Sequence, residues 1–114
     1  MIAPQDQAME TFFQGCRFIL LSGVPSSLGN LAFYKPVRFT ARKDNGCFGG
    51  CLIWSPDLHL SQSGDNMRMA FYSFGNEMRR MMDKFLDDPD WFQCETDKSA
   101  ILAMQDLVVD FVPF

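Results

Sequence analysis

The residues with the most versatile chemistry in this chain are four cysteines (Cys16, Cys47, Cys51 and Cys94) and a single histidine, His59. Cys47 and Cys51 are separated by three residues, and His59 follows them, which is the beginning of a zinc-ligand pattern. A structural zinc site needs a second closely spaced ligand pair, and none follows, so no metal is predicted. On a straight strand Cys47 and Cys51 would lie about 13 Å apart, too far for a disulfide without a tight turn between them. We favour reduced, mostly buried thiols, with a small thiol- or zinc-binding protein as the alternative.

Any histidine-based acid–base or nucleophilic catalysis would have to use His59, because the chain has no other histidine. Its neighbours are Leu58 and Leu60, and no local motif places a serine or a cysteine beside it. The glycine-bearing segment 22–30 lacks the Lys-Ser/Thr ending of a phosphate-binding loop and the glycine spacing of a dinucleotide fingerprint. We therefore predict that the protein is not an enzyme and uses no cofactor.

A cluster of acidic and aromatic residues forms the strongest candidate for a binding site. Its members are Asp87, Asp88, Asp90, Trp91, Phe92 and Glu95. The cluster lacks the alternating ligands, central glycine and distal glutamate of a calcium-binding EF-hand loop. Two interpretations follow from the same residues: both aromatic rings pack into the core beneath a turn, or they anchor a protein partner.

The distribution of charge separates the two halves of the chain. Residues 1–60 hold five Lys or Arg and four Asp or Glu, a net charge of +1. Residues 61–114 hold five and ten, a net charge of -5, which together give the overall -4. This balance argues against a protein that coats nucleic acid, whose surface is usually basic. It favours a protein partner with a basic surface, although solubility alone would also account for it.

Alternation of apolar and polar residues predicts an antiparallel sheet. The clearest strand is 31–43, where Val37, Phe39 and Ala41 alternate with arginines and a threonine. Asp44-Asn45-Gly46 is typical of a hairpin turn and predicts a return strand over 47–54. An apolar strand is predicted over 16–21, and 61–66 is predicted as a polar loop.

Helical periodicity predicts a short amphipathic helix over 4–15 and a long helix from about residue 66 to Leu86. Asp65 is the predicted N-cap of the long helix, and Pro89 forces its end. Gly75 weakens a helix, so we expect a close contact with another element there. Residues 96–114 fit a helix, a strand or both, and we favour a helix to about residue 105 followed by a strand.

Methionine is concentrated on the long helix, which carries Met67, Met69, Met78, Met81 and Met82. Four of these five lie on its apolar stripe. Such a stripe is most often part of a core, but flexible methionine also suits adaptable binding surfaces. A self-associating structural subunit, for instance a homodimer through this helix, is therefore a further hypothesis.

The chain of 114 residues has the size of one domain, residues 1–114. We predict an α+β fold, with an antiparallel sheet of three to four strands, one long helix packed on a face and a short N-terminal helix. No apolar run is long enough to cross a membrane, and the expected location is cytoplasmic. The function predicted is a small intracellular protein-binding module that acts by occluding a partner protein, of the inhibitor, immunity or phage anti-defence type.

Overall fold

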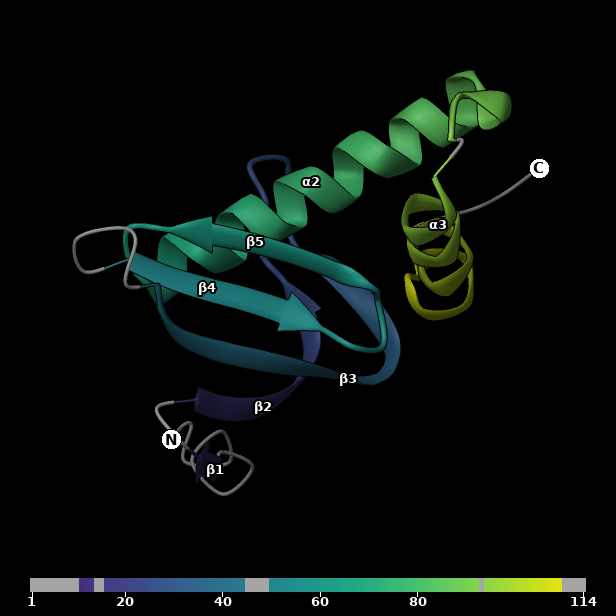
Figure 1. Cartoon of the computed structure of the whole chain (residues 1–114). Helices are drawn as coiled ribbons and strands as arrows, with labels where there is room; N and C mark the ends of the chain where they lie inside the picture. The colour runs from purple at the N-terminus through teal and green to yellow at the C-terminus, as the bar shows by residue number, and fades with distance from the viewer. Residues whose placement is uncertain (1–10, 14–15, 45–49, 93, 110–114) are drawn as a thin grey trace.

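The computed structural model describes residues 11–13, 16–44, 50–92 and 94–109. Within these ranges five strands form one antiparallel sheet whose spatial order follows the sequence. They are β1 (Thr11–Phe13), β2 (Cys16–Val24), β3 (Leu31–Asp44), β4 (Gly50–Ser55) and β5 (Leu60–Gly64). The helix α2 (Met67–Asp87), the short 3-10 helix η1 (Pro89–Trp91) and the helix α3 (Glu95–Leu107) follow the sheet (Figure 1). The predicted α+β class is confirmed, and β2 to β5 supply the predicted sheet, which β1 extends at one edge.

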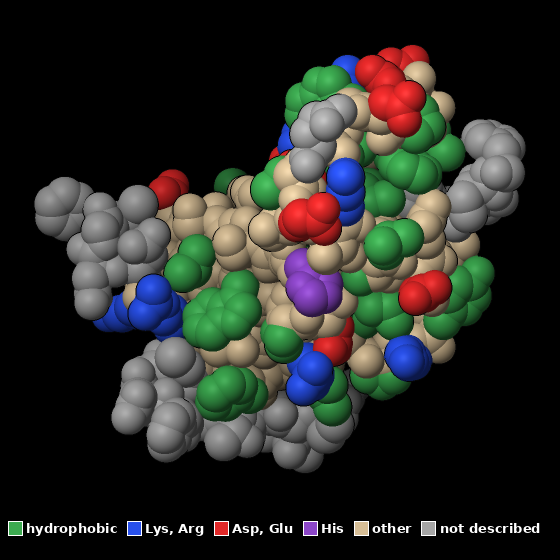
Figure 2. Space-filling view, turned by 45° about the vertical axis from the view of Figure 1, so that its right-hand side comes forward, with side chains coloured by type: hydrophobic (Ala, Val, Ile, Leu, Met, Phe, Trp, Pro, Cys, Tyr) green, Lys and Arg blue, Asp and Glu red, His purple; other side chains and the backbone are tan. Residues whose placement is uncertain are grey.

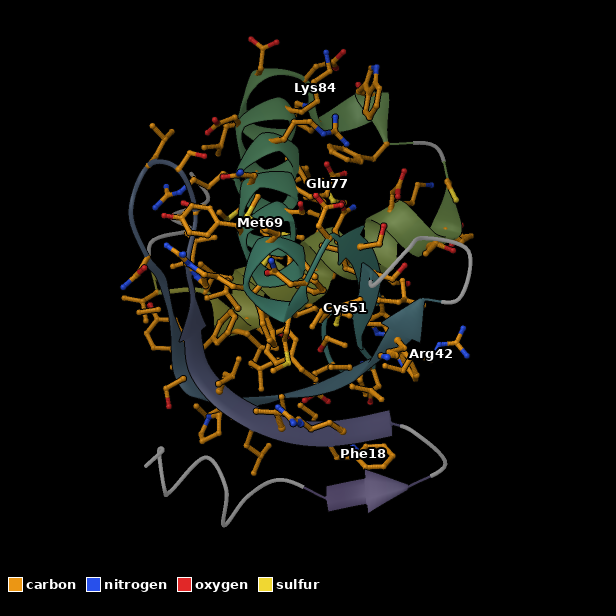
Figure 3. All side chains as sticks on the ribbon, turned by 90° about the vertical axis from the view of Figure 1, so that its left-hand side faces the viewer. Phe18, Arg42, Cys51, Met69, Glu77 and Lys84 are labelled. Carbon is orange, nitrogen blue, oxygen red and sulfur yellow. The ribbon has the colours of Figure 1, made fainter. Side chains whose placement is uncertain are left out.

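The alternation on β3 has the predicted consequence for the two faces of the sheet. Val37, Phe39 and Ala41 are buried, whereas Arg38 and Arg42 are exposed on the opposite face. The sheet curves around α2, so its concave face holds the core and its convex face is not covered by α2 (Figure 3). This curvature leaves the arginines of β3 accessible from outside.

The long helix α2 packs into the concave face of the sheet. The ring centre of Phe39 on β3 lies 5.4 Å from that of Phe71 and 5.2 Å from that of Phe74, both in edge-to-face geometry. The N-cap is Asn66, whose side-chain oxygen accepts a hydrogen bond of 2.9 Å from the backbone N–H of Met69. The predicted cap, Asp65, is therefore wrong by one residue, because the amide of Asn66 fills the same role.

Gly75 makes the close contact that the sequence predicted. A Cβ atom at this position would lie 1.9 Å from the carbonyl oxygen of Pro25, in the loop after β2. Only a residue without a side chain allows the helix and the loop to approach this closely. The contact brings α2 against the loop between β2 and β3. In the same loop, the backbone N–H of Ser27 donates a 2.7 Å hydrogen bond to the side chain of Asn76.

Two predictions near the sheet edges are wrong. Residues 11–13 form the strand β1, not the end of an N-terminal helix, and the rest of the predicted helix lies outside the described residues. The spacing of Phe12 and Phe13 predicts a helical stripe, but so short a segment does not distinguish the period of a helix from that of a strand. Residues 61–64 belong to β5 rather than to a polar loop, because an edge strand with one solvated face tolerates polar residues.

The C-terminal region is helix followed by a single bridge in the part that the structure describes. The helix α3 ends at Leu107, two residues beyond the predicted end, and Val108 pairs with Phe33 of β3. The predicted strand beyond residue 109 lies outside the described residues. Because α3 follows the sheet and α2 in sequence, the short helix that accompanies α2 is C-terminal and not N-terminal.

The methionine-rich stripe of α2 belongs mainly to the core. Met78, Met81 and Met82 are buried, Met67 is half-buried, and Met69 is exposed. The interpretation of the stripe as core is therefore supported for the three central methionines. Self-association through this helix stays a hypothesis.

Candidate functional site

The predicted acidic and aromatic cluster lies where α2 ends, beyond the edge of the sheet (Figure 1). Pro89 cannot continue the helix, so α2 stops at Asp87 and η1 turns the chain toward α3. The backbone N–H of Asp88 donates to the carbonyl oxygen of Lys84 at 2.8 Å, and that of Trp91 donates to Asp88 at 3.1 Å. These bonds fix the turn that presents the following aromatic residues.

The two aromatic residues have opposite environments. Phe92 is 4% exposed and joins the core, with its ring centre 6.3 Å from that of Phe85. Trp91 is 47% exposed and packs edge-on against Phe92, at 5.1 Å between ring centres. The ammonium nitrogen of Lys84 lies 5.2 Å from the centre of the Trp91 ring, within range of a cation–π interaction. One aromatic is therefore an anchor of the fold, and the other is an exposed ring held between two neighbours.

A hollow of about 490 Å³ opens beside this turn. It is lined by Phe85, Pro89, Asp90, Phe92, Lys98, Ile101 and Leu102. Its wall is mostly apolar, with one carboxylate and one ammonium group at the edges, and Leu102 is 62% exposed. A hollow of this size is large enough for one or two apolar side chains of a partner.

The charged residues around the hollow are mostly exposed and predominantly acidic. Residues 84–98 hold five acidic residues and two lysines, a net charge of -3. Glu95 lies 3.9 Å from Lys98, an exposed contact that leaves most of the Glu95 carboxylate in solvent. Figure 2 shows acidic side chains at the top of the molecule, above a band of hydrophobic side chains. The region thus combines an apolar hollow with an acidic rim.

The predicted thiol and metal candidates are dispersed. Cys47 lies outside the described residues, so a thiol or zinc site that uses Cys47 and Cys51 stays a hypothesis. Cys51 is half-buried between the sheet and α2 (Figure 3), and burial raises the pKa of its thiol. His59 is exposed in the turn after β4. Within the described ranges no three His, Cys, Asp or Glu side chains gather in a group that could hold a metal ion.

Cys94 is the residue whose chemistry the sequence did not distinguish. It is exposed, it lies immediately before α3, and it occupies the N-cap position. The backbone N–H groups of Asp97 and Thr96 at the start of α3, together with the Thr96 hydroxyl, lower the pKa of the Cys94 thiol. A cysteine directly before a helix start is the sequence signal that would have indicated this.

Comparisons with known protein families, with curated proteins and with solved structures find no match to this chain. Neither α2 nor α3, the two α-helices of the described residues, is long and apolar enough to cross a membrane.

Proposed function

We propose that this protein is a protein-binding module that acts by occluding a partner, using the end of the molecule formed by the C-terminus of α2, η1 and the N-terminal part of α3. We call this region the acidic end and define it by Asp87, Asp88, Asp90, Trp91 and Glu95 around the hollow. The partner would present a basic surface bearing an apolar side chain. Small proteins of the inhibitor, immunity or phage anti-defence type can act by such a contact alone.

The observation that carries the proposal is the exposed Trp91 beside an apolar hollow. An exposed tryptophan loses little conformational freedom on binding when its ring is already held, here by Lys84 and Phe92. Tryptophan is also among the residues most often found at the energetic centre of protein interfaces. The hollow offers a site for a complementary side chain of the partner. The exposed ring and the hollow together would therefore form the centre of a small protein interface.

The acidic rim supplies the electrostatic part of the proposed mechanism. Exposed charges of one sign raise the association rate of an oppositely charged partner, and salt weakens that effect. Asp87 and Asp88 are both exposed at the end of α2, where the helix dipole disfavours acidic residues. A role in steering a basic partner would offset this small structural cost.

The proposal is tested by affinity capture from the source organism with matched charge variants. Asp87→Lys/Asp88→Lys changes the acidic end, whereas Asp65→Lys/Asp106→Lys changes two exposed carboxylates elsewhere by the same amount. Each double variant shifts the net charge by +4, from -4 to 0. A basic protein should be retained by the wild type and by the control and lost from the first variant. Equal retention by both variants would refute the proposed role of the acidic end.

A further inference from the structure

A second hollow, of about 670 Å³, lies on a different part of the molecule and shares no lining residue with the first. It is formed where the β4–β5 turn meets β3 and the start of α3. Its lining includes Arg42, Trp54, His59, Ser61 and Thr96. Figure 2 faces this region, with the single histidine in purple near the centre of the view. The hollow is shallow and widely open to solvent, so a bound molecule would lie against its wall and would not be enclosed.

An arginine and a tryptophan form one wall of this hollow. The guanidinium carbon of Arg42 lies 5.9 Å from the centre of the Trp54 ring, and both residues belong to the outer face of the sheet. Figure 3 shows Arg42 projecting away from the sheet. Among the described residues no carboxylate forms an ion pair with Arg42. The guanidinium lies over the Trp54 ring, so the wall combines an aromatic and a cationic planar group against which a planar ring can stack.

His59 occupies a backbone conformation that favours glycine. Its φ of 55° lies in the left-handed region, and among the described non-glycine residues it is the only one with a positive φ. Hydrogen bonds hold the surrounding turn. The Ser55 carbonyl oxygen accepts from the His59 backbone N–H at 2.9 Å, and the Asp57 carboxylate binds the backbone and guanidinium of Arg38. Backbone strain of this kind is concentrated at functional sites, so the imidazole at the edge of the hollow is a candidate ligand group.

From these residues we propose that this second hollow binds a nucleotide, with the base stacked on Trp54 or on the guanidinium plane of Arg42, and the phosphate bound by Arg42 and His59. The hydroxyls of Ser61 and Thr96 would hydrogen-bond the sugar or the base. The overall acidic charge argues against a protein that coats nucleic acid, but a single nucleotide requires only local cations. Glu95 and Asp97 flank Thr96, so the phosphate belongs on the Arg42 side of the hollow and not at α3.

Trp54 serves as the reporter for the test. The chain has only two tryptophans, so in the Trp91→Phe variant Trp54 is the only source of tryptophan fluorescence. In this background, titration with AMP or UMP should produce saturable quenching at millimolar concentration or below. Adenosine alone and inorganic phosphate alone should each bind more weakly, because each lacks one half of the recognised group. No saturable quenching by either nucleotide would overturn the proposal.

Matched variants separate a site from general attraction of anions. Arg42→Gln should weaken AMP binding about tenfold, the effect of losing one charged hydrogen-bond donor. Lys43→Gln removes the same charge from the next residue of β3, which does not line the hollow, and should leave binding nearly unchanged. Equal losses in the two variants would refute the site.

A further variant tests His59 without endangering the fold. His59→Gly suits the positive φ, so it should preserve or raise stability while it weakens AMP binding several-fold. Unchanged AMP affinity in this variant would remove His59 from the site and contradict the proposal as stated.

A short single-stranded oligonucleotide identifies the source of the ligand. Tighter binding than AMP indicates a strand of nucleic acid, and weaker binding indicates the free nucleotide, and both results support the recognised chemistry.

Discussion

Truncation of the adjacent residues Trp91 and Phe92 should affect stability and partner binding in opposite orders. Phe92→Ala removes a ring that is 4% exposed and contacts Phe85, and truncations of this kind cost about 3–5 kcal/mol. Phe92 also lines the hollow, where the surroundings can relax, so we expect a loss near the lower limit, about 3 kcal/mol. Trp91→Ala removes an edge contact with Phe92, a cation–π contact with Lys84 and the covered half of a ring that is 47% exposed, so we expect a smaller loss of about 1–2 kcal/mol.

The assay is equilibrium urea unfolding followed by far-ultraviolet circular dichroism, a signal that does not depend on the tryptophan. Trp91→Phe is the control, because it keeps an aromatic ring and should be nearly neutral. Partner capture should show the reverse order, with Trp91→Ala abolishing retention of the basic partner. Equal destabilisation by Trp91→Ala and Phe92→Ala would refute the division of the pair into a surface ring and a core ring.

Three further predictions concern other parts of the structure. Gly75→Ala places a methyl group 1.9 Å from the carbonyl oxygen of Pro25. Urea unfolding should therefore show a loss of stability of about 1–3 kcal/mol, although alanine favours a helix over glycine by about 1 kcal/mol. A net stabilisation would contradict the close contact. Iodoacetamide should modify Cys94 faster than Cys51 near neutral pH, as measured by peptide mapping. The reason is that the pKa of the Cys94 thiol is lowered and that of the Cys51 thiol is raised. Similar modification rates would contradict these environments. Arg38 lowers the pKa of Asp57, so the stabilisation is present above the ordinary carboxyl pKa and is lost as the pH falls through the lowered value. Asp57→Asn should therefore reduce the loss of stability measured between about pH 5 and pH 2, and an unchanged acid dependence would argue against this ion pair.

Local patterns in the sequence were sufficient for the parts of the fold that depend on short-range physics. The alternation around Val37 and Phe39 predicted which face of β3 is buried, because side chains on a strand alternate by geometry. Pro89 predicted the end of α2 within one residue, because proline lacks the N–H that a helix needs. Gly75 predicted a close contact, although the sequence did not identify the loop at Pro25 as its partner.

The remaining features depend on contacts between distant segments. Trp91 and Phe92 have similar apolar character, and only the packing of the η1 turn decides which ring is buried. The hollow also needs Leu102 of α3, whose return toward the end of α2 has no local signal. The strand β1 is three residues long, and its pairing with β2 overrides a weak helical spacing.

The proposed function is tested most directly by site-specific photo-crosslinking. A photoreactive phenylalanine derivative is incorporated in place of Trp91, and in a parallel protein in place of Tyr34, an aromatic residue exposed on β3. Irradiation in extract of the source organism should crosslink position 91, and not position 34, to a basic protein. The crosslink should disappear when Asp87 and Asp88 are replaced by lysine. Absence of a protein adduct at position 91, or the same adduct from both positions, would contradict the proposed binding through the acidic end.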